Sequence, residues 1–170
     1  PNEANLHVIE AETLVYDVIQ ELTFLIQEIY PIALQEKGLP TTLREYIFEW
    51  ENRNDAVVKL TIQNEHSLPL ETEQAVYRVI QEALANIARH SKAKRVDISL
   101  IYSVDLLHIT IAVDGCGFDM EQKAKGMGFR SMRDRISSVR GTLQVQSASG
   151  QGTRVIAQLP IIKNSAGDKS

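Results

Sequence analysis

The apolar residues in the first part of the chain follow the spacing of a long helix with one buried seam. Steps of three and four residues alternate along residues 5–30, which is the rhythm of a coiled coil or a helical bundle, at Val8, Ala11, Val15, Val18, Leu22, Leu25 and Ile29. About 25 residues of helix make a rod of about 37 Å, and Pro31 ends or kinks it. Because a single helix leaves such a seam exposed, the pattern predicts a homodimer through this N-terminal helix.

After this rod, helical and strand patterns alternate. Apolar residues at helical spacing predict helices at residues 39–52, from about Glu71 to His90 and from Gly126 to about Val139. Alternating apolar and polar residues predict strands at residues 57–62, 95–101, 106–113, 142–145 and 153–159. We therefore expect an α+β fold, a two-layer α/β sandwich with helices on one face of a mixed sheet, preceded by the long bundle-forming helix.

Composition restricts the kinds of partner that the protein has. The 170 residues are 44% apolar and 24% charged, with a net charge of −4, so the sequence lacks the basic character of a nucleic-acid-binding protein. The single cysteine, Cys116, rules out an internal disulfide. No apolar run approaches the roughly 20 residues of a membrane span. We expect a cytoplasmic location, no direct nucleic-acid partner and no membrane segment in this fragment, either as a separate protein or as the cytosolic part of a longer, membrane-bound sensor.

The helix at residues 76–93 carries the first candidate chemistry. Glu82, Asn86 and His90 are spaced four residues apart, so they form one row along the edge of its apolar stripe. Acid and amide oxygens in such a row can hold a metal ion facing a cleft. The alternative is an ordinary half-solvated helix flank.

Pairs of glycines follow this helix at three places. Gly115 and Gly117 can shape a turn, Gly126 and Gly128 can let a loop enter a helix, and residues 147–152 can form a hairpin. A helix start preceded by glycines is also an anion site, because its free N–H groups and its dipole favour phosphate. Each pair taken alone leaves both interpretations open.

The order of the four motifs is more specific than any one of them. EALxNIxRHSxA at residues 82–93, DGCGFD at 114–119, GMGFRSMRDRI at 126–136 and GQGTRV at 150–155 together resemble the ATP-binding domain of sensor histidine kinases. That domain has the Bergerat-type (GHKL) ATPase fold. Within this family the sequence is most similar to kinases paired with response regulators that carry a helix-turn-helix DNA-binding domain.

The resemblance implies a site for Mg²⁺ and the ATP phosphates. Glu82 matches the catalytic acidic residue near the attacking water or Mg²⁺, and Asn86 matches the asparagine that coordinates Mg²⁺. Arg89 and His90 match positions near the phosphates, and the two glycines of GMGF match those where the lid meets the phosphate-facing helix. Mg²⁺ takes few protein ligands and keeps several waters, which suits this small set.

At the adenine end the sequence departs from the family. Gly115, Gly117 and Thr153 match residues around the base, but the aspartate that accepts a hydrogen bond from the adenine amine is replaced by Val113. An unpaired amine costs about 1–3 kcal/mol, or roughly 5–150-fold in affinity. Asp114 is the nearest candidate substitute, although strand alternation turns it to the other face unless a bulge re-aims it.

The resemblance divides the chain into three parts. Residues 1–35 are expected to be the second helix of the dimerisation and phosphoacceptor bundle, with the first helix absent. Residues 36–160 are expected to form the ATP-binding catalytic domain, and 161–170 a disordered tail. His7 lies too close to Pro31 to be the phosphoacceptor of a preceding hairpin.

Two functions follow from these observations. In the first, this is the catalytic portion of a two-component sensor histidine kinase, which transfers the γ-phosphate of ATP to a histidine on another helix for relay to a response regulator. In the second, the domain is degenerate, binds ATP weakly because of Val113, and acts as a dimerising signalling module.

Overall fold

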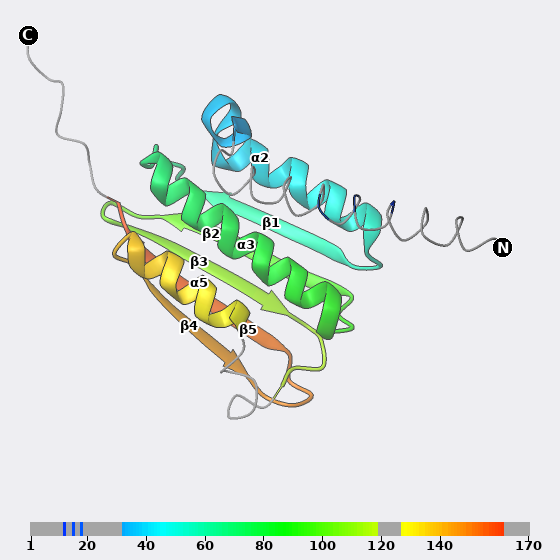
Figure 1. The fold of residues 1–170 in the computed structure, drawn as a ribbon. Coiled ribbons are helices and arrows are strands. Elements are labelled where there is room, and N and C mark those ends of the chain that lie inside the picture. The colour runs from blue at the N-terminus through cyan, green and yellow to red at the C-terminus, as the bar shows by residue number, and fades with distance from the viewer. Residues whose placement is uncertain (1–11, 13–14, 16–17, 19–31, 119–126, 162–170) are drawn as a thin grey trace, which may run out of the picture.

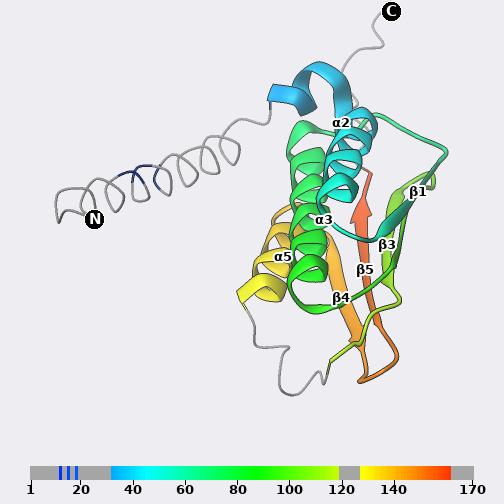
Figure 2. The ribbon, with the colours of Figure 1, turned by 90° about the vertical axis from the view of Figure 1, so that its right-hand side faces the viewer.

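Three helices cover one face of a five-stranded sheet (Figures 1 and 2). A computed structural model of the chain describes residues 12, 15, 18, 32–118 and 127–161. Its elements are α2 (Ile32–Arg53), β1 (Val57–Gln63), α3 (Leu70–His90), β2 (Arg95–Tyr102), β3 (Leu106–Val113), α5 (Met127–Ser138), β4 (Thr142–Ser147) and β5 (Thr153–Pro160). This arrangement confirms the predicted α+β sandwich.

The sheet is mixed, with the strand order β1-β2-β3-β5-β4. β1 and β2 are parallel, as expected for strands joined through a helix, and the other pairs are antiparallel. Alternate residues of each strand point toward the helices, so Ile98, Ile111 and Val155 lie opposite one another across β2, β3 and β5 and are all buried. The period-two pattern of the sequence therefore defines the core face.

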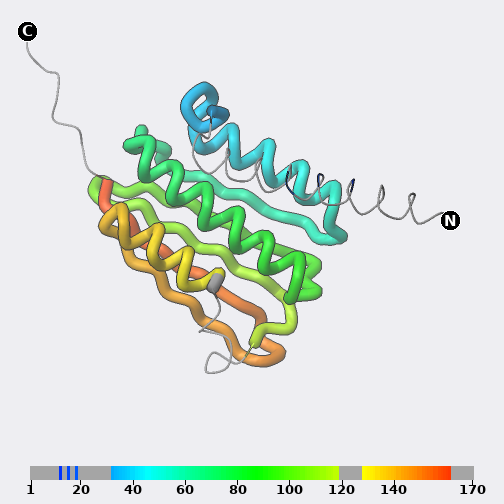
Figure 3. The backbone as a smooth tube through the Cα atoms, viewed as in Figure 1, coloured from blue at the N-terminus to red at the C-terminus, as the bar shows by residue number. Residues whose placement is uncertain are grey.

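α3 is the central helix and lies between α2 and α5 (Figure 3). Its apolar stripe is buried at 0–8% exposure, as the helical spacing predicts, at Val76, Val79, Ile80, Ala83, Leu84 and Ile87. α5 adds the fully buried Met132 and Ile136. The polar edge of α3 is thereby held against the start of α5.

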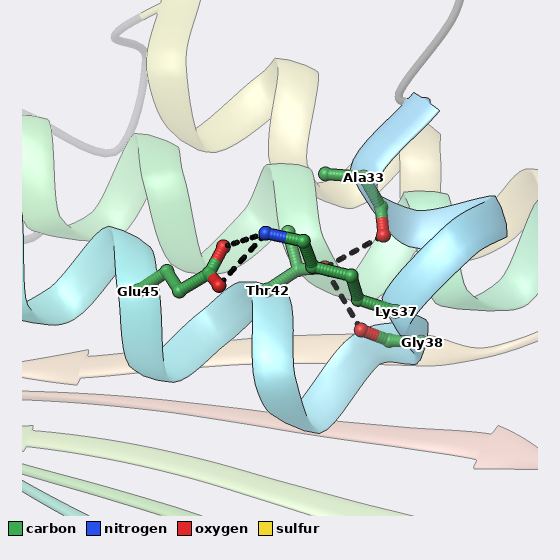
Figure 4. A network of polar contacts seen from close by, with 5 residues as sticks. All are labelled: Ala33, Lys37, Gly38, Thr42 and Glu45. Carbon is green, nitrogen blue, oxygen red and sulfur yellow. Dashed lines mark hydrogen bonds and ion pairs between the residues drawn. The ribbon is translucent and has the colours of Figure 1, made fainter.

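α2 begins earlier than the sequence predicts and contains a kink. Helical residues start at Ile32, and Gly38 interrupts them with a φ of 74° and a ψ of 168°. The Thr42 hydroxyl lies 2.8 Å from the Gly38 carbonyl oxygen and 3.1 Å from that of Ala33, so it contacts both halves (Figure 4). The helix that the sequence places at residues 39–52 is thus the second half of a longer element.

The C-terminal boundary also differs from the sequence prediction. Ile161, which the sequence assigns to the tail, is 9% exposed, and its N–H donates to the carbonyl oxygen of Asp105 at 2.8 Å. The rest of the predicted tail, residues 162–170, lies outside the described residues.

The predicted N-terminal rod lies almost wholly outside the described residues. Glu12, Val15 and Val18 are helical, and the two valines are 57% and 47% exposed. Homodimerisation through this segment therefore stays a prediction. None of the helices in the described part of the chain is long and apolar enough to cross a membrane.

Candidate functional site

A cavity of about 80 Å³ lies between α3, the start of α5 and the adjoining parts of β3 and β5. Its lining is mostly apolar and consists of Ala83, Asn86, Ile87, His90, Ser91, Ile111, Val113, Gly117, Phe118, Phe129, Met132, Thr153 and Val155. Of the site residues that the sequence suggests, Asn86, His90, Gly117 and Thr153 are in this lining. Segments separated by more than 60 residues in the sequence therefore meet at one cavity, as the motif order predicts.

The polar row of α3 is in contact with α5. A Cβ atom added to Gly128 would lie 2.5 Å from Glu82 Oε1 and 3.1 Å from Asn86 Nδ2, so the start of α5 is pressed against both side chains. Asn86 Nδ2 is buried and has no hydrogen-bond partner. An orphaned buried donor costs free energy unless a ligand or water pairs with it. Glu82 lies beside the cavity and outside its lining.

Three other suggested residues lie away from the cavity lining or outside the described residues. Arg89 is exposed near the end of α3. Gly115 packs against the end of the same helix, where an added Cβ would lie 2.5 Å from the Ser91 carbonyl oxygen. Gly126 lies outside the described residues. The structure thus brings the second glycines of DGCG and GMG to the site, Gly117 to the lining and Gly128 beside it.

The loop after β3 is fixed at both sides by backbone contacts. Cys116 donates its N–H to the Ser91 carbonyl oxygen at 2.9 Å and accepts the N–H of Gly150 at 2.7 Å. Gly117 has a φ of +60°, and a Cβ there would lie 2.0 Å from the Ala148 carbonyl oxygen. The turn at residues 147–152 therefore connects β4 to β5 and also packs against the loop after β3 and holds it in place.

Asp114 does not enter the cavity. One oxygen of its carboxylate accepts the backbone N–H groups of Lys94 and Arg95, both at 3.0 Å, and so ties the start of β2 to the end of β3. Its side chain lies with Asp97 and Arg154 along a groove outside the cavity. No bulge re-aims Asp114 toward the cavity in this structure, because ordinary strand alternation holds and the carboxylate has backbone partners.

We expect Asp114→Ala to lower the free energy of unfolding by about 1–2 kcal/mol, because two backbone donors lose their acceptor. Nucleotide affinity should change by less than about twofold. Chemical denaturation and calorimetric titration of the same preparation measure the two effects. A large loss of affinity in a stably folded variant would contradict this placement.

Val113 and Thr153 face each other across β3 and β5 at one end of the cavity. Val113 is 9% exposed and presents only methyl groups. The Thr153 hydroxyl lies 2.9 Å from the Ser147 hydroxyl, which also accepts the Phe118 N–H at 3.0 Å and donates to the Gly152 carbonyl oxygen at 2.9 Å. No acidic side chain of the described residues lines this cavity.

Sequence reasoning missed Phe118, Phe129 and Ser147. The two phenylalanine rings line the cavity with their centroids 5.3 Å apart. Each follows the second glycine of its motif, in DGCGF and GMGF, and this shared position was a usable signal. Ser147 had no such signal, because its role depends on how the turn packs against the loop.

The chain is similar to an ATPase family and to several sensor histidine kinases. The profile of the family described as histidine kinase-, DNA gyrase B-, and HSP90-like ATPase matches residues 71–163. Sensor histidine kinase LiaS of Bacillus subtilis (strain 168) is 32% identical over 149 residues, which are 87% of this chain and 41% of LiaS. Signal transduction histidine-protein kinase/phosphatase DegS of the same organism is 31% identical over 140 residues, or 77% of this chain and 36% of DegS. The chain thus spans less than half the length of these relatives.

Solved structures share the fold at lower identity. Histidine kinase AdeS of Acinetobacter baumannii superposes with a TM-score of 0.64 at 15% identity, covering 88% of this chain and 83% of that one. The histidine kinase domain of the blue-light activated kinase from Erythrobacter litoralis EL346 has a TM-score of 0.58 at 22% identity, over 72% of this chain and 61% of that one. With the family profile matching 71–163 of 170 residues, the chain belongs to the histidine kinase-, DNA gyrase B-, and HSP90-like ATPase family.

Proposed function

We propose that this chain is the ATP-binding catalytic portion of a two-component sensor histidine kinase. The cavity binds Mg-ATP, and the γ-phosphoryl group passes to a histidine nitrogen on another helix, leaving ADP. The observation that carries this proposal is the buried, unpaired Asn86 amide beside Gly128, at a cavity where the four motifs meet. The similarity to the sensor histidine kinase LiaS and the histidine-protein kinase/phosphatase DegS, 32% identical over 149 residues and 31% over 140, supports the assignment.

The residues at the α5 side of the cavity suit a metal and phosphates. The Asn86 side-chain oxygen would hold Mg²⁺, and its unpaired Nδ2 would donate to a phosphate or a metal-bound water. Mg²⁺ supplies charge neutralisation at the phosphates. The first N–H groups of α5, from Met127 onward, have no partner within the helix and favour an anion. Glu82, whose carboxylate lies against Gly128, would orient a metal ligand or accept a proton.

The described residues contain no cluster of three His, Cys, Asp or Glu side chains placed for a metal. This agrees with a metal held mainly by phosphates and waters through Asn86, as Mg²⁺ prefers. The base end fits less well, since Val113 offers an adenine amine no acceptor. We therefore expect binding energy to come mostly from the phosphate end.

The proposed setting is the one that the sequence resemblance implies. A homodimer through the N-terminal helix would bring a phosphoacceptor histidine to the cavity of this domain. A response regulator with a DNA-binding domain would then receive the phosphoryl group. We place this portion of the protein in the cytoplasm, where ATP and such regulators are found.

Calorimetric titration with Mg-ATP tests the proposal. Native protein should show saturable, Mg²⁺-dependent binding, and Asn86→Ala should weaken it by about tenfold, the scale of lost metal-site contacts. Glu71→Ala, at the exposed opposite end of α3, is the matched control and should bind as the native protein does. The titration is repeated with EDTA to isolate the metal contribution.

If native protein and Asn86→Ala bind Mg-ATP with equal affinity, Asn86 does not hold the metal. Absence of binding at millimolar Mg-ATP, in a protein that still dimerises, would favour the degenerate alternative. In that case the domain would be a partner-binding module that transmits signals through its helical bundle.

A further inference from the structure

The cavity offers a ligand very few hydrogen-bonding groups. Ser91 lines it, but its hydroxyl already donates to the Ile87 carbonyl oxygen at 2.9 Å and accepts the Ala93 N–H at 3.1 Å. Asn86 lies on the α5 side, against Gly128. His90 lines it from the exposed end of α3. Of the lining side chains that β3 and β5 contribute, the polar one is that of Thr153.

The hydrogen-bond network fixes what Thr153 can offer. The Ser147 hydroxyl has one proton, and the Gly152 carbonyl oxygen, 2.9 Å away, can only accept it. The contact of 2.9 Å between the Ser147 and Thr153 hydroxyls must then use the Thr153 proton. Thr153 therefore presents only lone pairs to the cavity, and it can accept a hydrogen bond but not donate one.

Its neighbour across the strands adds no polarity. Val113 is opposite Thr153 in the register, and Ile111 and Val155 continue the same apolar surface. A hydrophobic surface discriminates weakly between ligands that differ in one polar group, whereas a complementary donor and acceptor set discriminates strongly. This end of the cavity has an acceptor but no matching donor.

A site with a single acceptor does not distinguish adenine from a 6-oxopurine such as hypoxanthine, because the two bases differ only in which edge position carries the donor. Adenine has a donor amine at position 6 and an acceptor at N1, whereas hypoxanthine has an acceptor oxygen at position 6 and a donor N–H at N1. Each base thus has one donor on this edge that Thr153 can accept. Rejecting hypoxanthine would need a second polar group beside Thr153 that reads the remaining position, and the neighbouring strand side chains, Ile111, Val113 and Val155, are apolar.

We propose that the cavity binds purine nucleoside triphosphates without distinguishing a 6-amino from a 6-oxo base. The inference rests on the proposed function, because it assumes that a nucleotide occupies the cavity. Thr153 accepts a hydrogen bond from the base, whether the donor is the amine at position 6 or the N–H at N1. Val113 is the residue responsible for the loss of adenine selectivity.

Calorimetric titrations with three Mg-nucleotides test this inference. Inosine triphosphate differs from ATP at position 6 and in the N1 proton, and purine riboside triphosphate has no donor on this edge. Native protein should bind ATP and inosine triphosphate within about threefold of each other, and purine riboside triphosphate about two- to tenfold more weakly, the value of one neutral hydrogen bond.

Thr153→Val matches the native side chain in shape and removes the acceptor. It should weaken ATP and inosine triphosphate by the same factor and leave purine riboside triphosphate unchanged, so that all three converge. A general distortion of the cavity would instead weaken all three, and that outcome would overturn the role assigned to Thr153. Melting curves of the variant report its folding independently.

Two results would overturn the inference in distinguishable ways. A preference of tenfold or more for ATP over inosine triphosphate would show that another group reads adenine, while leaving the proposed function intact. Absence of saturable binding of all three nucleotides would overturn the proposed function and this inference together.

Discussion

Replacing Val113 by aspartate is expected to raise the affinity of the domain for Mg-ATP by about tenfold or more. The sequence resemblance implies that Val113 takes the position of an aspartate that accepts the adenine amine. Its side chain lines the cavity and is 9% exposed, so a carboxylate there would meet the base with little competition from water. A hydrogen bond to a charged group is worth about 1.5–3 kcal/mol.

The same burial opposes the substitution in the absence of ligand. A carboxylate placed among Ile111, Phe118 and Val155 loses solvation, so we expect a lower melting temperature in the free protein. Nucleotide binding should recover part of that stability, since it pairs the buried charge. The expected signature is therefore a lower melting temperature without ATP and a larger upward shift with it.

Val113→Asn is the matched control, because it has the size of aspartate without the charge. It should raise affinity less than Val113→Asp, since a neutral acceptor contributes about 0.5–1.5 kcal/mol. Calorimetric titration gives the affinities, and differential scanning calorimetry gives the melting temperatures. Unchanged ATP affinity in a folded Val113→Asp protein would show that the base lies elsewhere.

The order and type of the secondary structure elements in the described part could be predicted from the sequence because apolar periodicity and burial agree. The strand at 142–145 was predicted two residues short, since β4 continues through Gln146 and Ser147. Those two residues are polar but pair with Arg154 and Thr153 in the sheet. Backbone pairing extended the strand where side-chain hydrophobicity gave no signal.

The site was predictable where it depends on one helix and on glycine spacing. Asn86 and Gly117 reach the cavity because the period of α3 and the loop after β3 place them there. The hydrogen bond between the Phe118 N–H and the Ser147 hydroxyl was not predictable, because it forms only when the turn at residues 147–152 packs against the loop after β3. Hydrogen bonds between segments distant in sequence depend on packing, which periodicity does not describe.

The variant Gly128→Ala, at the start of α5, tests nucleotide binding separately from folding stability. The added methyl group would lie 2.5 Å from Glu82 Oε1 and 3.1 Å from Asn86 Nδ2, which are the ends of flexible side chains and can move aside. Because no backbone atom is that close, the fold should be retained, and alanine in a helix gains up to about 1 kcal/mol over glycine.

Gly128→Ala should therefore keep or raise the melting temperature while weakening Mg-ATP binding by about tenfold to a hundredfold, the range seen when residues supporting a metal site are disturbed. The added methyl group would displace Glu82 and Asn86 from the positions where they would meet the metal and the phosphates. Ser131→Ala, on the exposed side of α5, controls for changes in the helix itself. If Gly128→Ala binds Mg-ATP as tightly as native protein, neither side chain contributes to the site in its present position.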